Sequence, residues 1–557
     1  MENSTIIKKI KDHAQNRLNR YLSKLSLREQ QFLINEVIRI YDYKYDLSLI
    51  ERSKRDETLD FIDFSFPIVS RYLYKDYNVI GFPLIPSSPQ SMQYTQDFLN
   101  ICFKIGLMEN YEELLRLGIL KYEVISEKHA RLSYTNKYNS IERIEKTKSV
   151  KYSHAMMRAL DGEYYEGFSQ LPRIIEKMEK LVFIWNSDFI GYDADPEVDD
   201  FFIQNAQLDF VQATEWDSFP LTSFFGGVPY HYFLSALIAI ESICLKHLQF
   251  VEIATKKYPW LEKHNILPCV VDYEALFDSL SFILGESREV IETVMSALIY
   301  NEEKRDYYSH IGAPNPLFLR VSSTQLLRSF SGCIYRPIEF MLAELKRRYP
   351  NDWSRNSNER EQLFKDDLYK YFKGDRFIVF DRNIEIVEDG NIITDIDACI
   401  IDKETYDIAF IQLKWQDSIY ESTRSLISKR NNFVEKVTKW VDDIEKWIYR
   451  SSEKRIADYL HLSPHHINKK KIKIFVIGRH NANFSGNQIP YENSVWCQWY
   501  SLIEIIEEKF KESINIQKLF ELIHEKNPYF ENYPVKKSEI LYGNYLVELE
   551  GPTYNQA

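Results

Sequence analysis

Two aspartates, a glutamine and a lysine lie close together in the segment 391–415, NIITDIDACIIDKETYDIAFIQLKW. They are Asp395, Asp397, Gln412 and Lys414, and the residues around them are mostly apolar. An unpaired buried carboxylate costs several kcal/mol, so these polar side chains need partners. Carboxylate and amide oxygens are ligands suited to Mg²⁺, and a lysine beside them can orient an attacking water. The residue types therefore allow a metal site or, alternatively, a salt bridge on a half-exposed sheet.

The same segment has the pattern of a β-hairpin. Residues 392–401 and residues 408–414 alternate in side-chain direction, and the link between them is polar and turn-like. An antiparallel pairing that sets the last residue of the first strand opposite the first residue of the second places Asp397 opposite Gln412. In this register the other aspartate faces Lys414.

The order of these residues resembles a known signature. Asp397 followed by Gln412-Leu413-Lys414 is similar to the D…(E/Q)xK motif of the PD-(D/E)xK, or restriction-endonuclease-like, nuclease superfamily. The glutamine in place of glutamate resembles the branch that includes Mrr-type restriction enzymes. The resemblance covers residues 351–542 only. It implies an α/β/α domain and a metal-dependent phosphodiesterase, above all a DNA endonuclease, with Mg²⁺ or Mn²⁺ as cofactor.

This resemblance suggests a role for each residue. Asp397, the side-chain oxygen of Gln412 and the carbonyl of Leu413 would bind the metal, which polarises the scissile phosphate. Lys414 would stabilise the developing negative charge or position the water. Asp395 or Glu361 would contribute through a bound water or a second ion. In the alternative interpretation the two aspartates and Lys414 form a structural ion pair. Gln412 leaves this alternative open, because a neutral glutamine binds a metal more weakly than a glutamate.

A fourth candidate lies upstream of the hairpin. The spacing predicts a helix over residues 358–372, with Phe364 and Leu368 on its inward face, followed by a strand over residues 377–387. Glu361 shares the inward face of this helix. The resembled family often carries an additional acid on this first helix, so Glu361 is the candidate for it. The alternative is that Glu361 compensates the helix dipole.

The charge distribution limits how nucleic acid could bind. The chain of 557 residues has a net charge of −12, which argues against a general coat for nucleic acid. Between Trp415 and His480, however, 14 Lys and Arg residues stand against 8 Asp and Glu residues, a net charge of +6. Within this segment Arg424, Lys429 and Arg430 are the residues expected to contact phosphates.

The pattern of elements predicts a mixed fold. Residues 1–340 read as a mostly α-helical scaffold or recognition region, which comprises one or more subdomains and offers a surface for a protein partner or for oligomerisation. Residues 351–545 alternate strands and helices, as expected of an α/β nuclease-like domain. Residues 546–557 are expected to be a tail.

The cysteines and the N-terminus bear on the compartment. Six cysteines are scattered without a CxxC motif, which favours neither a zinc ribbon nor a disulfide framework. We expect a cytoplasmic protein without a signal peptide or a membrane span.

A nuclease of this kind is compatible with anti-phage defence or DNA maintenance. The alternative function is that of a catalytically inactive nuclease-fold protein that binds protein or nucleic acid. The sequence leaves DNA or RNA as the substrate open.

Overall fold

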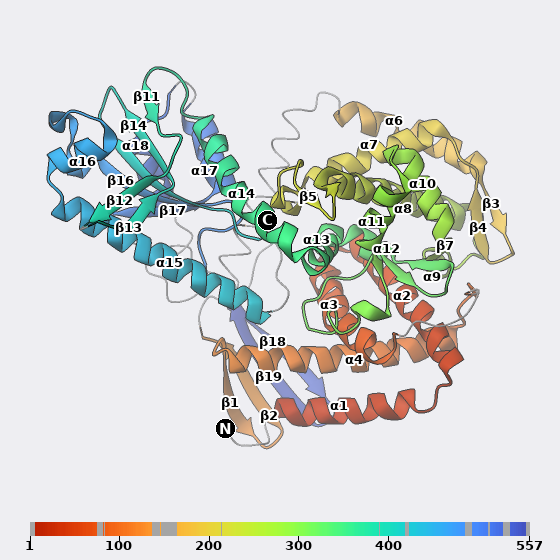
Figure 1. Ribbon diagram of the computed structural model, residues 1–557. Helices are drawn as coiled ribbons and strands as arrows, with labels where there is room; N and C mark the ends of the chain where they lie inside the picture. The colour runs from red at the N-terminus through yellow and green to blue at the C-terminus, as the bar shows by residue number, and fades with distance from the viewer. Residues whose placement is uncertain are drawn as a thin grey trace.

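The structure is a computed structural model that describes residues 6–74, 82, 84–135, 145, 164–212, 214–388, 390–417, 423–484, 493–510, 513–526 and 535–552. The N-terminal part is mostly helical, and strands alternate with helices in the C-terminal part (Figure 1). The mixed fold class expected from the sequence is confirmed.

The N-terminal helices pack around a large apolar core and a smaller second one, to which Ile174, Phe201 and Phe250 belong. Helix α2, for example, begins with a capping box in which Ser26 and Glu29 bind each other's backbone N–H groups, and it buries residues such as Ile34, Val37 and Tyr41. The helices are α1 (Ile6–Leu22), α2 (Leu27–Ile50), α3 (Arg55–Tyr72), α4 (Pro89–Arg116), α6 (Tyr164–Leu181), α7 (Pro196–Gln212), α8 (Tyr230–Lys257), α9 (Lys263–Ile266), α10 (Tyr273–Leu284), α11 (Arg288–Ser296), α12 (Phe330–Ile334) and α13 (Pro337–Arg348).

Short strands complete this region. Strands β7, β10, β9 and β8 form one small sheet in that order, and β3–β4 and β5–β6 are separate hairpins. Their bounds are β3 (Val182–Trp185), β4 (Phe189–Tyr192), β5 (Phe224–Phe225), β6 (Val228–Pro229), β7 (Cys269–Asp272), β8 (Ile299–Tyr300), β9 (Phe318–Arg320) and β10 (Gln325–Arg328).

Helix α8 is the one helix, among the residues described, that is long and apolar enough to cross a membrane. Its most apolar window is 61% buried within the protein. A core helix passes the same test of length and composition, so this finding is weak evidence for a membrane span.

The change from the N-terminal core to the C-terminal core falls inside one helix, α14 (Pro350–Tyr369). Trp353 near its start packs in the N-terminal core, whereas Phe364 and Leu368 pack in a core of the C-terminal part. Helix α14 begins at Pro350 rather than at residue 358, because proline is favoured at the first position of a helix. A single rigid element therefore links the two parts of the chain.

The C-terminal part is built on a five-stranded sheet with the order β11-β14-β15-β16-β17. Strand β15 pairs antiparallel with β14 and parallel with β16, and β16 pairs parallel with β17. Strand β16 is buried and interior, as its apolar sequence predicts. The strands are β11 (Phe377–Val379), β14 (Ala398–Asp402), β15 (Ile408–Lys414), β16 (Ile472–Gly478) and β17 (Ser494–Gln498).

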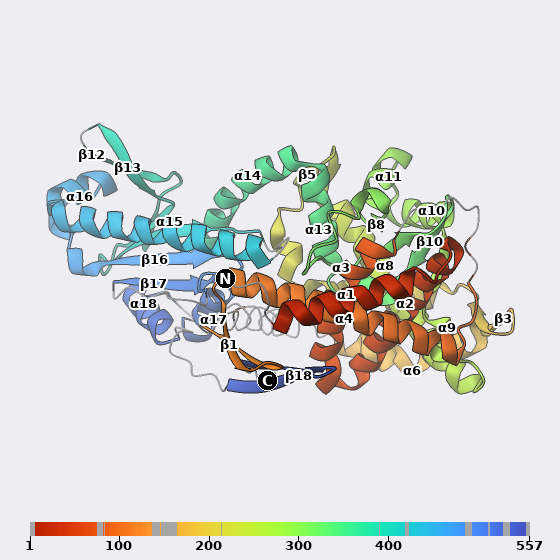
Figure 2. The ribbon, with the colours of Figure 1, turned by 90° about the horizontal axis from the view of Figure 1, so that it is seen from below.

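Helices cover both faces of this sheet (Figures 1 and 2). One face packs against α14, α17 (Trp499–Lys509) and α18 (Ile516–Glu525). The other packs against α15 (Thr423–Arg450) and α16 (Glu453–Leu460). The first turns of α15 extend beyond the sheet, and Ile427 there packs in the N-terminal core.

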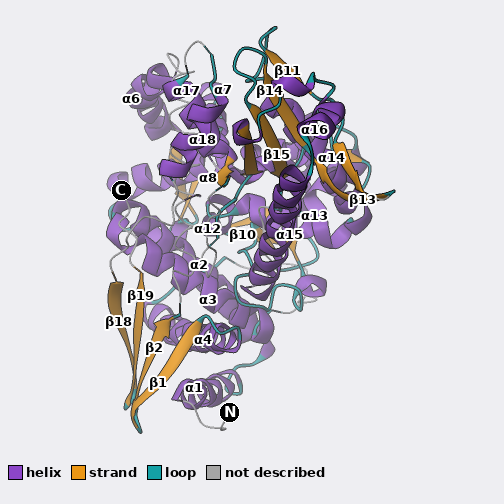
Figure 3. Ribbon diagram, turned by 90° about the vertical axis from the view of Figure 1, so that its left-hand side faces the viewer, coloured by secondary structure: helices purple, strands orange, loops and turns teal. Residues whose placement is uncertain are grey.

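The last strands return to the N-terminal part of the chain. Strands β18 (Val535–Tyr542) and β19 (Tyr545–Pro552) join the hairpin β1 (Leu120–Ser126) and β2 (His129–Tyr134) in a sheet of order β1-β2-β19-β18 (Figure 3). The expectation of a tail from residue 546 is therefore wrong for β19. Its backbone pairs parallel with β2 and antiparallel with β18, and Val547 is fully buried.

Candidate active site

The central hairpin has the register expected from the sequence. Ile401 pairs with Ile408, and Ala398 pairs with Ile411 at the other end of β14. One residue further on, Asp397 lies opposite Gln412. The side-chain amide of Gln412 donates a hydrogen bond to Asp397 Oδ2, and the backbone N–H of Leu413 donates to the same oxygen at 2.8 Å.

The predicted first strand of the hairpin is not continuous. It bends at Asp397, and the residues before the bend form β13 (Asn391–Ile396), which pairs with β12 (Ile384–Glu388) in a separate two-stranded sheet. The expected strand over residues 377–387 is likewise divided between β11 and β12. The Asp397 carboxylate accepts the Leu413 N–H, which a continuing strand would have paired through its backbone.

The bend overturns the expected pairing of Asp395 with Lys414. Asp395 lies in β13, where it faces Glu385 of β12. Its Oδ2 accepts a hydrogen bond of 2.9 Å from Nδ2 of Asn383, and the same nitrogen lies 3.3 Å from Asp397 Oδ1. Asp395 therefore stays beside Asp397 but reaches it through an amide rather than across the hairpin.

Lys414 and Glu361 complete the cluster. The Lys414 Nζ lies 3.7 Å from Asp397 Oδ2 and 3.6 Å from Glu361 Oε1. Glu361 comes from α14, whose Phe364 and Leu368 are buried against the sheet, as the helical spacing predicted. Asp397, Gln412, Lys414 and Glu361, which come from three separate elements, thus meet at one place.

Exposure increases across the cluster. Gln412 is 5% exposed, and the side chains of Asp397, Lys414 and Glu361 are 14%, 27% and 48% exposed. Lys414 and Glu361 are therefore accessible to solvent, whereas Gln412 is buried at the inner end of the cluster. The cluster is thus open to solvent on the side of Glu361.

The carboxylates outnumber the lysine at this surface. Burial raises the pKa of Asp397, and the Lys414 ammonium and the Leu413 N–H only partly oppose this. The negative charges of Glu361 and Asp395 raise the same pKa further. A cation placed among these oxygens would favour the ionised form of Asp397.

The oxygen donors present are of the kind that Mg²⁺ or Mn²⁺ prefers. Asp397 offers a carboxylate. The carbonyl of Leu413 is a second candidate ligand, since the N–H of the same residue donates to Asp397. Gln412 now directs its Nε2 at Asp397, so its oxygen would face a shared ion only after the amide turned over. Within the described ranges, no group of three or more His, Cys, Asp or Glu side chains is arranged to hold a metal ion.

Two residues of the site were not predicted from the sequence. Lys365 is buried one helical turn after Glu361, and its Nζ donates a hydrogen bond of 3.0 Å to Oδ1 of Asn383. Asn383 lies between β11 and β12 and binds both aspartates. The four-residue spacing from Glu361 was a signal for Lys365, whereas a single loop asparagine carried none.

The basic residues expected to contact phosphates lie on α15. Arg430 is partly buried, and its guanidinium lies 3.3 Å from Oδ1 of Asn431. Arg424 and Lys429 belong to the same helix, but their side chains lie outside the described residues.

The end of β15 is joined to the N-terminal part by buried polar contacts. Trp415 Nε1 donates to the carbonyl of Asp217 at 3.2 Å, and the guanidinium of Arg479 binds both carboxylate oxygens of Asp217 at 2.7 and 3.0 Å. The backbone N–H of Arg479 also donates to the backbone carbonyl of Lys414 at 2.8 Å. The backbone of Lys414 is thereby linked through one arginine to the helical part.

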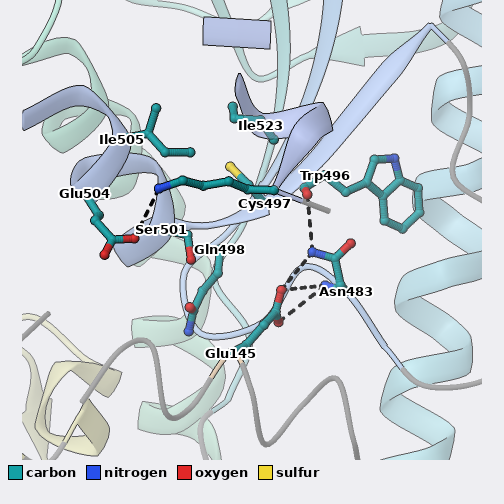
Figure 4. A pocket seen from close by; sticks show the side chains of 10 residues that line it. Glu145, Asn483, Trp496, Cys497, Gln498, Ser501, Glu504, Ile505 and Ile523 are labelled. Atoms are coloured by element: carbon teal, nitrogen blue, oxygen red, sulfur yellow. Dashed lines mark hydrogen bonds and ion pairs between the residues drawn. The ribbon is translucent and has the colours of Figure 1, made fainter. Parts of the chain in front are cut away.

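A second contact of this kind lines a small hollow beside the loop that follows β16 (Figure 4). The Glu145 carboxylate accepts hydrogen bonds from the N–H groups of Ala482 and Asn483 and from Asn483 Nδ2 at 2.8 to 3.2 Å. The hollow has a volume of about 30 Å³, which leaves room for about two waters. It is therefore too small for a substrate.

Comparisons of the chain with protein-family models, with curated proteins and with solved structures found no match.

Proposed function

We propose that the C-terminal part is a restriction-endonuclease-like domain of the PD-(D/E)xK kind, and that it hydrolyses phosphodiester bonds of DNA with Mg²⁺ or Mn²⁺. The observation that carries this proposal is the meeting of Asp397, Gln412, Lys414 and Glu361 at a solvent-accessible place. The mixed sheet, with a hairpin followed by parallel strands and with helices on both faces, supports the same conclusion.

In this proposal Asp397, Gln412 Oε1 and the Leu413 carbonyl hold the metal, with Asp395 as an outer ligand. The metal, when bound, polarises the phosphate and lowers the pKa of a water. Lys414 neutralises charge that develops on the phosphate. Its Nζ lies 3.6 to 3.7 Å from the carboxylates of Glu361 and Asp397, longer than a hydrogen bond, so its N–H groups are available to a substrate oxygen.

The alternative is an inactive nuclease-fold protein that binds a partner. One observation favours it: the Gln412 amide already satisfies Asp397 Oδ2 without any ion. The experiment that separates the two functions is incubation of the protein with plasmid, single-stranded DNA and RNA in Mg²⁺, Mn²⁺ or EDTA. We expect metal-dependent cleavage of DNA. Intact substrates under all these conditions would favour the inactive binding protein.

Substitutions of Gln412 test its role as a ligand. Gln412→Glu should keep cleavage and bind Mn²⁺ more tightly, because a second carboxylate attracts the ion more strongly. Gln412→Leu should lose cleavage by about 10²-fold or more, because it removes the oxygen without adding bulk. Cleavage rates and calorimetric titration with Mn²⁺ measure both effects. Equal activity of the leucine variant would remove Gln412 from the metal site.

Neutralising the start of α15 tests the path of the substrate. The triple change of Arg424, Lys429 and Arg430 to Ala should weaken DNA binding about equally for all sequences. The slope of log affinity against log salt should fall by about 0.9 for each phosphate of duplex DNA that the variant no longer neutralises. Binding is measured in Ca²⁺ at several salt concentrations.

A matched triple change of Lys9, Lys24 and Lys121 to Ala serves as the control, since these exposed lysines lie in the N-terminal part. It alters the net charge equally but should leave the slope unchanged. The same slope for both triple variants would place the substrate path away from α15.

A further inference from the structure

A buried lysine lies behind the two aspartates of the site. Lys365 is 2% exposed, and its one hydrogen bond among the residues described goes to an amide, that of Asn383. Burial lowers the pKa of Lys365, and the negative charge of Asp397 is the strongest influence that opposes this. A buried ammonium is costly unless it is paired, so its hydrogen bond to a neutral group needs an explanation.

The hydrogen-bonding groups of Asn383 explain why Lys365 binds a neutral amide. Its Nδ2 donates to Asp395 Oδ2 at 2.9 Å and to Asp397 Oδ1 at 3.3 Å, and its Oδ1 accepts from Lys365 Nζ at 3.0 Å. An ammonium group can only donate hydrogen bonds, and an ionised carboxylate can only accept them. If the amide turned over, its oxygen would face two carboxylates and its NH₂ would face the ammonium. Lys365 therefore fixes the orientation of the amide.

This orientation matters because the backbone alone does not hold the two aspartates together. Asp395 belongs to β13 in the two-stranded sheet, and Asp397 stands at the bend before β14 in the five-stranded sheet. The Asn383 amide is the group that bridges their side chains across the bend. Without the bridge the two carboxylates could separate, since they repel each other.

We propose that Lys365 is a positioning residue which, through Asn383, holds the Asp395 and Asp397 carboxylates in a fixed arrangement for a divalent cation. This inference rests on the proposed nuclease function and adds to it a residue that would not touch the metal or the substrate. Residues that orient metal ligands in this way typically change metal affinity by about 10- to 100-fold when replaced.

The test compares Lys365→Met with Lys365→Gln. Both substitutions remove the charge, but only glutamine keeps an N–H donor for Asn383. We expect Lys365→Met to bind Mn²⁺ at least about tenfold more weakly than the wild type, and Lys365→Gln to recover a large part of that loss. Calorimetry with Mn²⁺ gives the affinities, and thermal melting in EDTA shows that each variant is folded. Lys370→Met, which changes an exposed lysine just after α14, should bind Mn²⁺ like the wild type.

Three results would overturn the inference. Wild-type affinity in folded Lys365→Met would show that Lys365 does not organise the site, while the proposed function would stand on the wild-type protein. Equal losses in the methionine and glutamine variants would mean that charge, not amide orientation, is what Lys365 contributes. If the wild type neither bound Mn²⁺ nor cleaved DNA, the proposed function and this inference would both be wrong.

Discussion

Asp397→Asn should reduce metal-dependent cleavage of DNA by about 10³-fold or more, because it removes the carboxylate on which the proposed metal site is centred. The substitution keeps the shape of the side chain, and an Asn oxygen can still accept the Leu413 N–H that Asp397 binds at 2.8 Å. The NH₂ of the new Asn would face Asn383 Nδ2, so the variant gives up that 3.3 Å contact, but the fold should remain intact. Cleavage rates of wild type and variant, measured with Mg²⁺ and with Mn²⁺, provide the comparison.

The same variant should not be less stable than the wild type at neutral pH. Burial raises the pKa of Asp397, so the folded protein holds this proton more tightly than the unfolded chain, whose aspartates titrate near about 3.9. The wild type consequently loses stability as pH rises from that value through the folded pKa, and the Asn variant does not lose this contribution. Melting temperatures of both proteins between about pH 3 and pH 8, in EDTA, should diverge in this direction. Full cleavage activity in a folded Asp397→Asn protein would contradict the assignment of the site.

The second large effect concerns stability. Asp217→Asn should lower the free energy of unfolding by about 3 kcal/mol, because removing one partner of a buried ion pair leaves the other charge uncompensated. The Asp217 and Arg479 side chains are each only 10% exposed, and the Arg479 guanidinium also lies over the ring of Trp415, 4.5 Å from its centre. Asp367, at 3.0 Å from Arg479, offsets part of the loss. Unfolding in urea measures the change.

The matched control is Asp443→Asn, which breaks the pair that Lys439 and Asp443 form on the surface of α15. Lys439 is 72% exposed there, so the change should cost less than about 1 kcal/mol. If Asp217→Asn cost no more than this control, the buried polar groups at the end of β15 would not join the two parts of the protein energetically.

The hairpin and the acid of the first helix could be predicted from the sequence because they depend on local periodicity. Alternation along 408–414 indicated the register that places Asp397 beside Gln412, and helical spacing put Glu361 on the face that carries Phe364. These are short-range rules, and they hold wherever an apolar face packs against a core.

The rest depends on interactions between distant segments. The bend at Asp397 arises because β13 pairs with β12 rather than continuing in the five-stranded sheet, and an alternating sequence fits either arrangement. Strand β19, expected to be a tail, pairs with β2, which lies far earlier in the chain, and the His129 ring contacts the Glu548 carboxylate at 2.8 Å. The bridge from Lys365 through Asn383 likewise joins a helix to a loop.

A calorimetric titration with Mn²⁺ of the wild type and of Asp397→Asn at neutral pH tests whether Asp397, Gln412, Lys414 and Glu361 form one metal-dependent site. We expect the wild type to bind Mn²⁺ and the variant, although folded, to have lost this binding. Equal binding by both proteins would place the metal elsewhere, and no binding by the wild type would contradict the proposed metal site itself.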